Sequence, residues 1–120
     1  MSLYRLSVSL YNKEDMKGRE TMWKDAIEMR EAVASGAVSP KELVQETLDK
    51  IEQRNPSLNA VVHLQAERAL EEAEERSFEG LPFGGVPLLL KDLGQNQAGE
   101  PSSAGSKLLK GIPVSRTDNF

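Results

Sequence analysis

Apolar residues recur at helical spacing in three segments after position 20. In the first segment, Trp23, Ala26, Ile27 and Val33 fall on one face of a helix. Gly36 is placed to end this helix, because glycine readily adopts the left-handed conformation that follows a last helical turn. The pattern therefore predicts a short helix that packs through this face.

The second segment carries a complete start signal for a helix. Ser39 suits the N-cap, Pro40 suits the first helical position, and Glu42 completes a capping box. The apolar face of this helix consists of Leu43, Val44, Leu48 and Ile51. We expect the helix to stop at Asn55–Pro56, because a residue before proline avoids the helical region.

The third segment, residues 64–77, predicts a helix with a narrow apolar stripe. The stripe consists of Ala66, Ala69, Leu70 and Ala73. Because most of these side chains are small, we expect this helix to lie close against a neighbouring helix.

Two apolar runs predict strands, "NAVVHL" at 59–64 and "VPLLL" at 86–90. The second run is apolar throughout and is flanked by glycines, which is typical of a strand covered on both faces in a parallel or mixed sheet. Pro87 is tolerable near the start of that strand. Most of the chain beyond it predicts loop. Together the elements predict an α/β fold.

Residues 1–20 differ from the rest of the chain. Leu6, Val8 and Leu10 alternate with serines, a pattern that predicts a short strand, and a strongly polar stretch follows. We interpret residues 1–20 as a leader, an extension of foreign origin or the result of a misplaced start codon. Residues 21–120 are the part in which we expect the fold.

Composition narrows the classes of function. A net charge of −4 argues against nucleic acid as a partner, because the chain has no surplus of cations to neutralise phosphates. The absence of cysteine excludes disulfides and thiolate metal sites, and a single histidine argues against a zinc site or a Ser-His-Asp triad. No apolar run approaches the roughly 20 residues of a membrane span. We expect a cytoplasmic protein without a membrane partner.

Lys91 and Asp92 directly follow the run at 86–90. In open α/β sheets, ligands bind beyond the carboxyl ends of the strands. Partial burial of Lys91 would lower its pKa, because burial disfavours the charged form, and a neutral lysine can act as a general base. Alternatively, Lys91 pairs with Asp92 or extends its amine to water. The residues by themselves leave both interpretations open.

The stretch "GVPLLLKDLGQNQAGEPSSAGSKLL" resembles the N-terminal part of the amidase signature family. That family carries a Gly-(Ile/Val)-Pro segment, three apolar residues and Lys-Asp, followed by Gly-x-Pro-(Ser/Thr)-(Ser/Thr)-x-Gly-Ser. The matching residues here are Gly85, Val86, Pro87, Lys91, Asp92, Gly99, Pro101, Ser102, Ser103, Gly105 and Ser106. The upstream stretch from "SGAVSP" to "LNAVV" and the terminal "TDNF" are similar to further family segments. The resemblance covers about residues 22–120.

The resemblance implies the N-terminal helices and first strands of the mixed-sheet amidase signature fold, in incomplete form. It also implies hydrolysis of linear or cyclic carboxamides by a Ser–cis-Ser–Lys triad, in which Lys91 takes a proton from one serine and that serine relays to the nucleophile. This scheme needs no metal and no cofactor. Both family serines lie in later motifs that do not occur here, and Ser102, Ser103, Ser106 and Ser115 do not match them. We therefore expect these residues on their own to be an inactive fragment.

Two further residues are candidates for a supporting role. Asp92 adjoins the lysine, and Ser106 either holds the loop near Lys91 by hydrogen bonding or serves simple turn chemistry. The expected partner is a small-molecule amide, and a homodimer of the full-length enzyme stays open. One alternative is a segment of the family branch that transfers ammonia to glutamyl-tRNA, which usually reads Lys-Asp-Asn. Leu93–Gly94 at that point looks more like the stand-alone amidases, including those acting on nylon-type oligomers. The other alternative is a non-catalytic interaction module.

Overall fold

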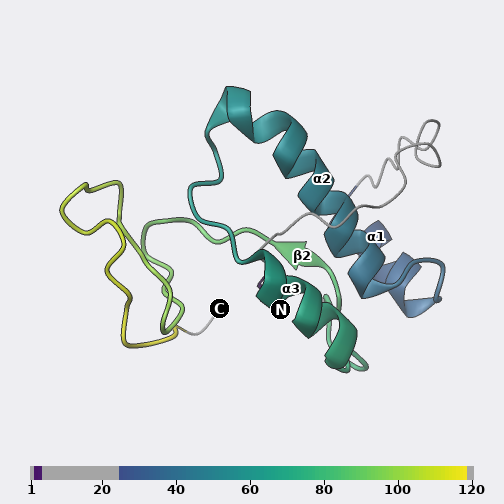
Figure 1. Cartoon of the computed structure of the whole chain (residues 1–120). Coiled ribbons are helices and arrows are strands. Elements are labelled where there is room, and N and C mark those ends of the chain that lie inside the picture. The colour runs from purple at the N-terminus through teal and green to yellow at the C-terminus, as the bar shows by residue number, and fades with distance from the viewer. Residues whose placement is uncertain (1, 4–24, 119–120) are drawn as a thin grey trace. The chain divides into compact units, whose positions relative to one another are not determined.

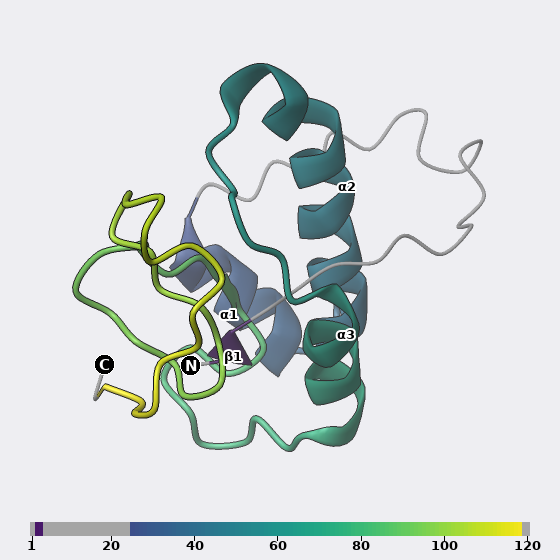
Figure 2. The ribbon, with the colours of Figure 1, turned by 60° about the vertical axis from the view of Figure 1, so that its left-hand side comes forward.

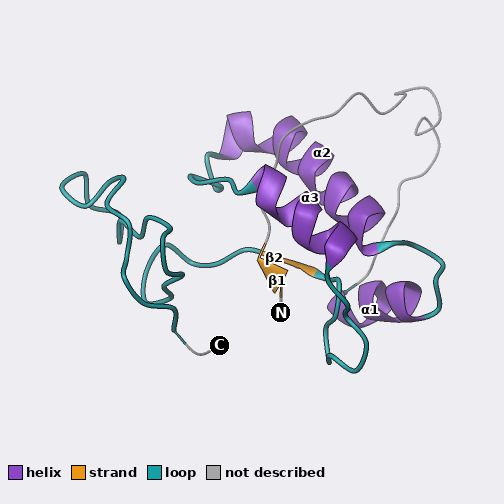
Figure 3. Ribbon diagram, turned by 60° about the horizontal axis from the view of Figure 1, so that its bottom comes forward, coloured by secondary structure: helices purple, strands orange, loops and turns teal. Residues whose placement is uncertain are grey.

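The computed structural model describes residues 2–3 and 25–118 (Figure 1). In chain order the described elements are β1 (Ser2–Leu3), α1 (Ala26–Ala34), α2 (Pro40–Leu58), α3 (Ala66–Glu75) and β2 (Pro87–Leu88). The chain divides into two compact units, residues 1–88 and residues 89–120. The first unit holds all of these elements, and the described part of the second is loop (Figure 3).

Helix α1 begins at a side-chain cap. The carboxylate of Asp25 accepts hydrogen bonds from the N–H groups of Ile27 and Glu28, both at 2.9 Å. Gly36 follows the helix with φ +75°, which confirms its predicted place. The predicted packing face is wrong at Ile27, which is 54% exposed, whereas Ala32 is buried. Trp23 lies outside the described residues.

The predicted start of α2 is confirmed. The Ser39 hydroxyl accepts the N–H of Glu42 at 3.1 Å, and the Glu42 carboxylate accepts the N–H of Ser39 at 2.8 Å. Pro40 occupies the first helical position, where its missing N–H costs no hydrogen bond. Leu43, Val44 and Leu48 are buried as expected, and Ile51 is half-buried.

The predicted end of α2 at Asn55–Pro56 is wrong, because the helix continues through Pro56 to Leu58. It ends at Asn59, which takes the left-handed conformation with φ 49° and donates its N–H to the Asn55 carbonyl at 2.7 Å. The Asn55 side chain also exchanges two hydrogen bonds with the backbone of Val61, at 2.9 and 2.8 Å. These contacts offset the conformational preference of a residue before proline and the donor that proline lacks.

Helices α2 and α3 form the core of the first unit, and α3 lies beside the N-terminal half of α2 (Figure 2). The buried cluster comprises Val44, Leu48, Ala69 and Ala73, with Leu70 packed against it. Ala69 is fully buried, so its small side chain permits the close approach that the alanine stripe predicted. At the edge of the contact, the Lys41 amine lies 2.7 Å from the Glu74 carboxylate.

The predicted strand at 59–64 is wrong. These residues form no strand and connect α2 to α3, with Val62 67% exposed. β2 is real but short, and it pairs in parallel with β1, with Ser2 opposite Pro87 and Leu3 opposite Leu88. Coverage on both faces is also wrong, because both β2 residues are half-buried and Leu89 is 58% exposed. The elements fit an α/β class, and the described sheet has two strands. The period-2 pattern around Leu6–Leu10 lies outside the described residues.

A tight turn leads into β2. A Cβ atom at Gly84 would lie 2.4 Å from the Phe78 carbonyl oxygen. At Gly85, which has φ +78°, a Cβ atom would meet Pro40 Cγ at 3.0 Å. The turn therefore packs against the start of α2 closely enough to require glycine.

Candidate functional site

The segment from Leu89 to Asp118 folds back on itself through a few backbone contacts. Gly99 donates its N–H to the Val114 carbonyl at 2.9 Å, and Val114 donates to the Glu100 carbonyl at 3.0 Å. Pro101 and Pro113 form an isolated antiparallel bridge between these two arms. Because proline has no N–H, the ladder cannot extend through the bridge, and the segment stays a loop.

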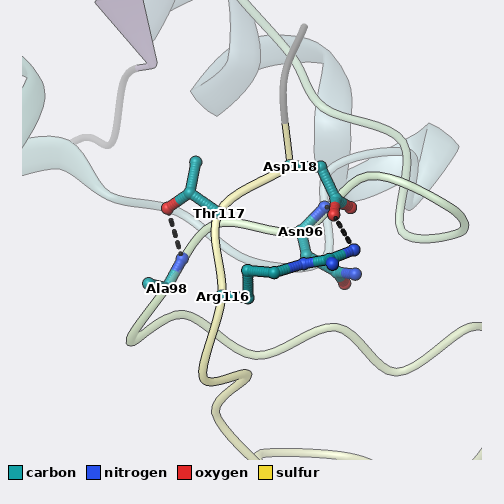
Figure 4. A network of polar contacts seen from close by, with 5 residues as sticks. All are labelled: Asn96, Ala98, Arg116, Thr117 and Asp118. Atoms are coloured by element: carbon teal, nitrogen blue, oxygen red, sulfur yellow. Dashed lines mark hydrogen bonds and ion pairs between the residues drawn. The ribbon is translucent and has the colours of Figure 1, made fainter.

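Asp118 holds the two ends of this loop together (Figure 4). Its carboxylate accepts the Asn96 N–H at 3.0 Å and an Arg116 guanidinium N–H at 2.9 Å. The Asp118 N–H returns a bond to the Asn96 carbonyl at 3.0 Å, and the Thr117 hydroxyl accepts the Ala98 N–H at 3.1 Å. The hydrogen bond from Arg116 is the largest cause that lowers the pKa of Asp118, followed by the bond from Asn96.

Asp92 holds the middle of the loop. Its Oδ1 accepts the Ser103 N–H at 2.7 Å, and its Oδ2 accepts the Ser103 hydroxyl in a short hydrogen bond. The Gly105 N–H donates to the same Oδ2 at 3.4 Å. Because donors stabilise the carboxylate, these bonds lower the pKa of Asp92, the Ser103 hydroxyl most and the Ser103 N–H next.

The donors come from a turn with unusual backbone conformation. Ala104 has φ 48° and Gly105 has φ 73°, so two successive residues are left-handed. For alanine this conformation is costly, because its Cβ crowds the backbone. Such a turn directs consecutive N–H groups toward one acceptor, and here that acceptor is the Asp92 carboxylate.

Ser106, the serine singled out from the sequence, makes a local contact. Its hydroxyl accepts the Leu108 N–H at 3.3 Å, and its N–H donates to the Ser103 carbonyl at 2.8 Å. Sequence reasoning missed Ser103, which joins the loop to the segment after β2. The motif places several hydroxyls at similar spacing after the Lys-Asp pair, so spacing gave no way to choose among them.

Lys91 lies three residues beyond the end of β2 and is exposed. Its N–H donates to the Gln95 side-chain oxygen at 3.4 Å. The expected partial burial of its side chain is therefore not found in the described residues. Within the same part of the chain, no ion pair joins Lys91 to Asp92, whose oxygens are taken by Ser103 and Gly105. A catalytic role for Lys91 stays a prediction.

The residues with a described structure offer neither a metal site nor a membrane span. No three histidine, cysteine or acidic side chains among them gather in a way that suits a metal ion. None of the helices in residues 25–118 combines the length and the apolar character needed to cross a bilayer.

The motifs around this loop can be set against known proteins. The protein-family model described as Amidase matches residues 42–118, which is more than half of the chain. The match includes α3, most of α2, the Lys-Asp pair and the loop that Asp92 holds. The chain therefore belongs to the amidase family, and the resemblance drawn from its motifs is confirmed.

Three curated relatives indicate the range of this family. A lipoamidase of Enterococcus faecalis is 41% identical over 95 residues, which cover 79% of this chain and 13% of that protein. A 6-aminohexanoate-cyclic-dimer hydrolase of Pseudomonas sp. (strain NK87) is 38% identical over 89 residues, covering 74% and 17%. A glutamyl-tRNA(Gln) amidotransferase subunit of Methylacidiphilum infernorum (isolate V4) is 39% identical over 84 residues, covering 70% and 17%.

The chain spans less than a fifth of the length of these relatives. The comparison with solved structures found no match.

Proposed function

We propose that the protein is a cytoplasmic amidase that hydrolyses a linear or cyclic carboxamide of a small molecule. The observation that carries this proposal is the family match across residues 42–118, which includes Lys91 in the family's Lys-Asp motif. Relatives named as a lipoamidase and as a cyclic-dimer hydrolase support hydrolysis of an amide bond.

In the proposed mechanism, the neutral amine of Lys91 accepts a proton from a serine beside a cis peptide bond. That serine in turn takes the proton of a second serine, whose oxygen attacks the amide carbonyl. The amine leaves with a proton, and an acyl-enzyme ester remains. Water then cleaves the ester, so that one amide and one water yield one carboxylic acid and one amine. Both serines belong to motifs outside these 120 residues and would come from elsewhere in the full-length protein.

A second candidate function is that of a glutamyl-tRNA amidotransferase component. It is favoured by relatives of that name from Methylacidiphilum infernorum and Nitratidesulfovibrio vulgaris, at 39% and 37% identity. The Leu93–Gly94 pair after the motif departs from the Lys-Asp-Asn of that branch. We therefore prefer the stand-alone amidase.

The test uses the full-length protein expressed from its gene, with an aliphatic amide, a nitroanilide and 6-aminohexanoate cyclic dimer as probes. Lys91→Ala should lower kcat/KM for a cleaved probe by about 10²- to 10⁴-fold, the range for a general base. The matched control is Lys110→Ala, which removes an exposed lysine of the same loop unit and should change kcat/KM less than about twofold.

Three results would count against the proposal. Near-normal turnover by Lys91→Ala would remove the lysine from the mechanism. Release of ammonia from glutamine, with no cleavage of the three probes, would favour the amidotransferase. Absence of hydrolysis together with absence of labelling by a fluorophosphonate, which reacts covalently with activated serines, would favour the non-catalytic module.

A further inference from the structure

The contact between Asp92 and Ser103 closes a loop of eleven residues with a two-point grip. The Ser103 N–H reaches Oδ1 at 2.7 Å, and the Ser103 hydroxyl reaches Oδ2. A carboxylate held at both oxygens by one residue cannot rotate without breaking both bonds. The Gly105 N–H, 3.4 Å from Oδ2, adds a third donor from the same turn. The orientation of the Asp92 side chain is therefore set by the turn at 103–105.

This orientation matters because Asp92 follows Lys91 directly in the chain. A carboxylate within about 4 to 6 Å of an amine favours the ammonium form, and a lysine held in that form cannot accept a proton. The flexible four-carbon stem of a lysine can bring its amine to a carboxylate on the next residue once that carboxylate is free to turn. In the structure both oxygens of Asp92 are engaged by the turn, and no ion pair between the two neighbours is found in the described residues.

Among the described residues, the groups that face the Asp92 carboxylate are uncharged. They belong to Ser103, Ala104 and Gly105, and their hydrogen bonds, with an opposing effect of burial, account for its pKa. Lys91 meets Gln95 through its backbone N–H. The other charged side chains of the described loop unit are Glu100, Lys107, Lys110, Arg116 and Asp118. Of these, Arg116 and Asp118 pair with each other.

We infer that Ser103 is a positioning residue that holds the Asp92 carboxylate away from the Lys91 amine, so that the amine stays available as a proton acceptor. This inference rests on the proposed function and adds a residue to it. The left-handed Ala104 fits the same role, because a costly backbone conformation is retained where it directs donors to Asp92.

The experiment measures the pH dependence of kcat/KM in the full-length protein with a cleaved amide probe. Loss of activity at low pH reports protonation of the free enzyme's general base. Ser103→Ala frees one oxygen of Asp92, so the acid limb should move to higher pH by about one unit. Asp92→Asn has no charge to offer the amine, so the limb should not move upward. The double variant Asp92→Asn/Ser103→Ala should lack the upward shift of Ser103→Ala, as coupled residues require.

Ser115→Ala is the matched control, because it removes an exposed hydroxyl from the same loop unit. Its acid limb should coincide with that of the unaltered protein. Ser103→Thr keeps a hydroxyl and should restore the original limb. If Ser103→Ala does not fold, Asp92→Glu replaces it, because the longer side chain keeps the charge and disturbs the two-point grip. The same upward shift is expected.

Several outcomes would overturn the inference. A uniform loss of activity in Ser103→Ala, with no movement of the acid limb, would assign Ser103 a structural role only. An upward shift that persists in the double variant would show that Asp92 is not its source. Lys91→Ala separates this inference from the proposed function. If that variant is nearly normal the function fails, whereas if it is inactive and Ser103→Ala does not shift the limb, only the role of Ser103 fails.

Discussion

Ser103 donates both its N–H and its hydroxyl to the carboxylate of Asp92, eleven residues earlier in the chain. The pair joins the two halves of the family motif, since Asp92 belongs to the Lys-Asp pair and Ser103 belongs to the Gly-x-Pro-Ser-Ser loop. Hydrogen bonds to a charged acceptor are stronger than neutral ones. One aspartate thereby orders a turn that has little apolar burial to hold it.

The first prediction concerns acid. The pKa of Asp92 is lowered below the ordinary aspartate value of 3.8, mainly by the Ser103 hydroxyl. Because the folded pKa lies below the unfolded one, the carboxylate contributes its full stabilisation above pH 3.8 and loses it as the pH falls through the folded pKa. Nuclear magnetic resonance should show the Asp92 carboxyl carbon titrating below 3.8, with faster amide exchange at Ser103 in Asp92→Asn. A carboxyl titration at or above 3.8 would contradict this prediction.

The second prediction concerns the contact between α2 and α3. Leu48 is 2% exposed and belongs to the cluster with Ala69 and Ala73, so Leu48→Ala should lower the free energy of unfolding by about 2 to 5 kcal/mol. Leu58→Ala in the same helix is the control, because Leu58 is 66% exposed and its truncation should cost less than about 1 kcal/mol. Urea denaturation followed by circular dichroism measures both. Equal losses would show that the cluster is not the core.

The third prediction concerns the start of α2. Ser39→Ala removes the acceptor for the Glu42 N–H, so the free energy of unfolding should fall by about 0.5 to 2 kcal/mol. Ser57→Ala serves as its control, because the Ser57 hydroxyl donates to the Arg54 carbonyl near the other end of the helix. The same denaturation assay applies. A Ser39→Ala variant as stable as Ser57→Ala would mean that the cap adds nothing.

The fourth prediction concerns the turn before β2. Gly84→Ala places a Cβ 2.4 Å from the Phe78 carbonyl oxygen, a backbone atom that cannot move aside cheaply. Gly80→Ala meets no atom within 4 Å and carries only the cost of its φ of +74°. We expect Gly84→Ala to lower the thermal midpoint more than Gly80→Ala. The reverse order would show that the turn is looser than its geometry implies.

Local signals were enough to predict the elements of the first unit that depend on neighbouring residues. Ser39 and Glu42 marked the start of α2, and the alanine stripe of α3 indicated close packing. The expected strand at 59–64 failed because a strand needs a partner, and β propensity does not supply one. The expected stop at Pro56 failed because the Asn55 side chain bonds Val61, a contact that no pattern of apolar residues reports.

The loop that carries the candidate site was harder to foresee. The Lys-Asp pair and the serine-rich loop were both visible as motifs, which the family match confirms. Which serine meets Asp92 depends on the left-handed pair Ala104–Gly105, and alanine gives no hint of that conformation in a sequence. For the same reason, the exposed position of Lys91 depends on where the backbone turns after β2 rather than on its neighbours in the chain.

The bridge between Pro101 and Pro113 has a consequence for solubility. A free β edge is a template on which another polypeptide can stack, and this loop exposes Leu108 and Ile112 close in sequence to the bridge. Proline at both facing positions removes the amide donors that an incoming strand would need, so sticky side chains are displayed without a backbone template for fibril growth.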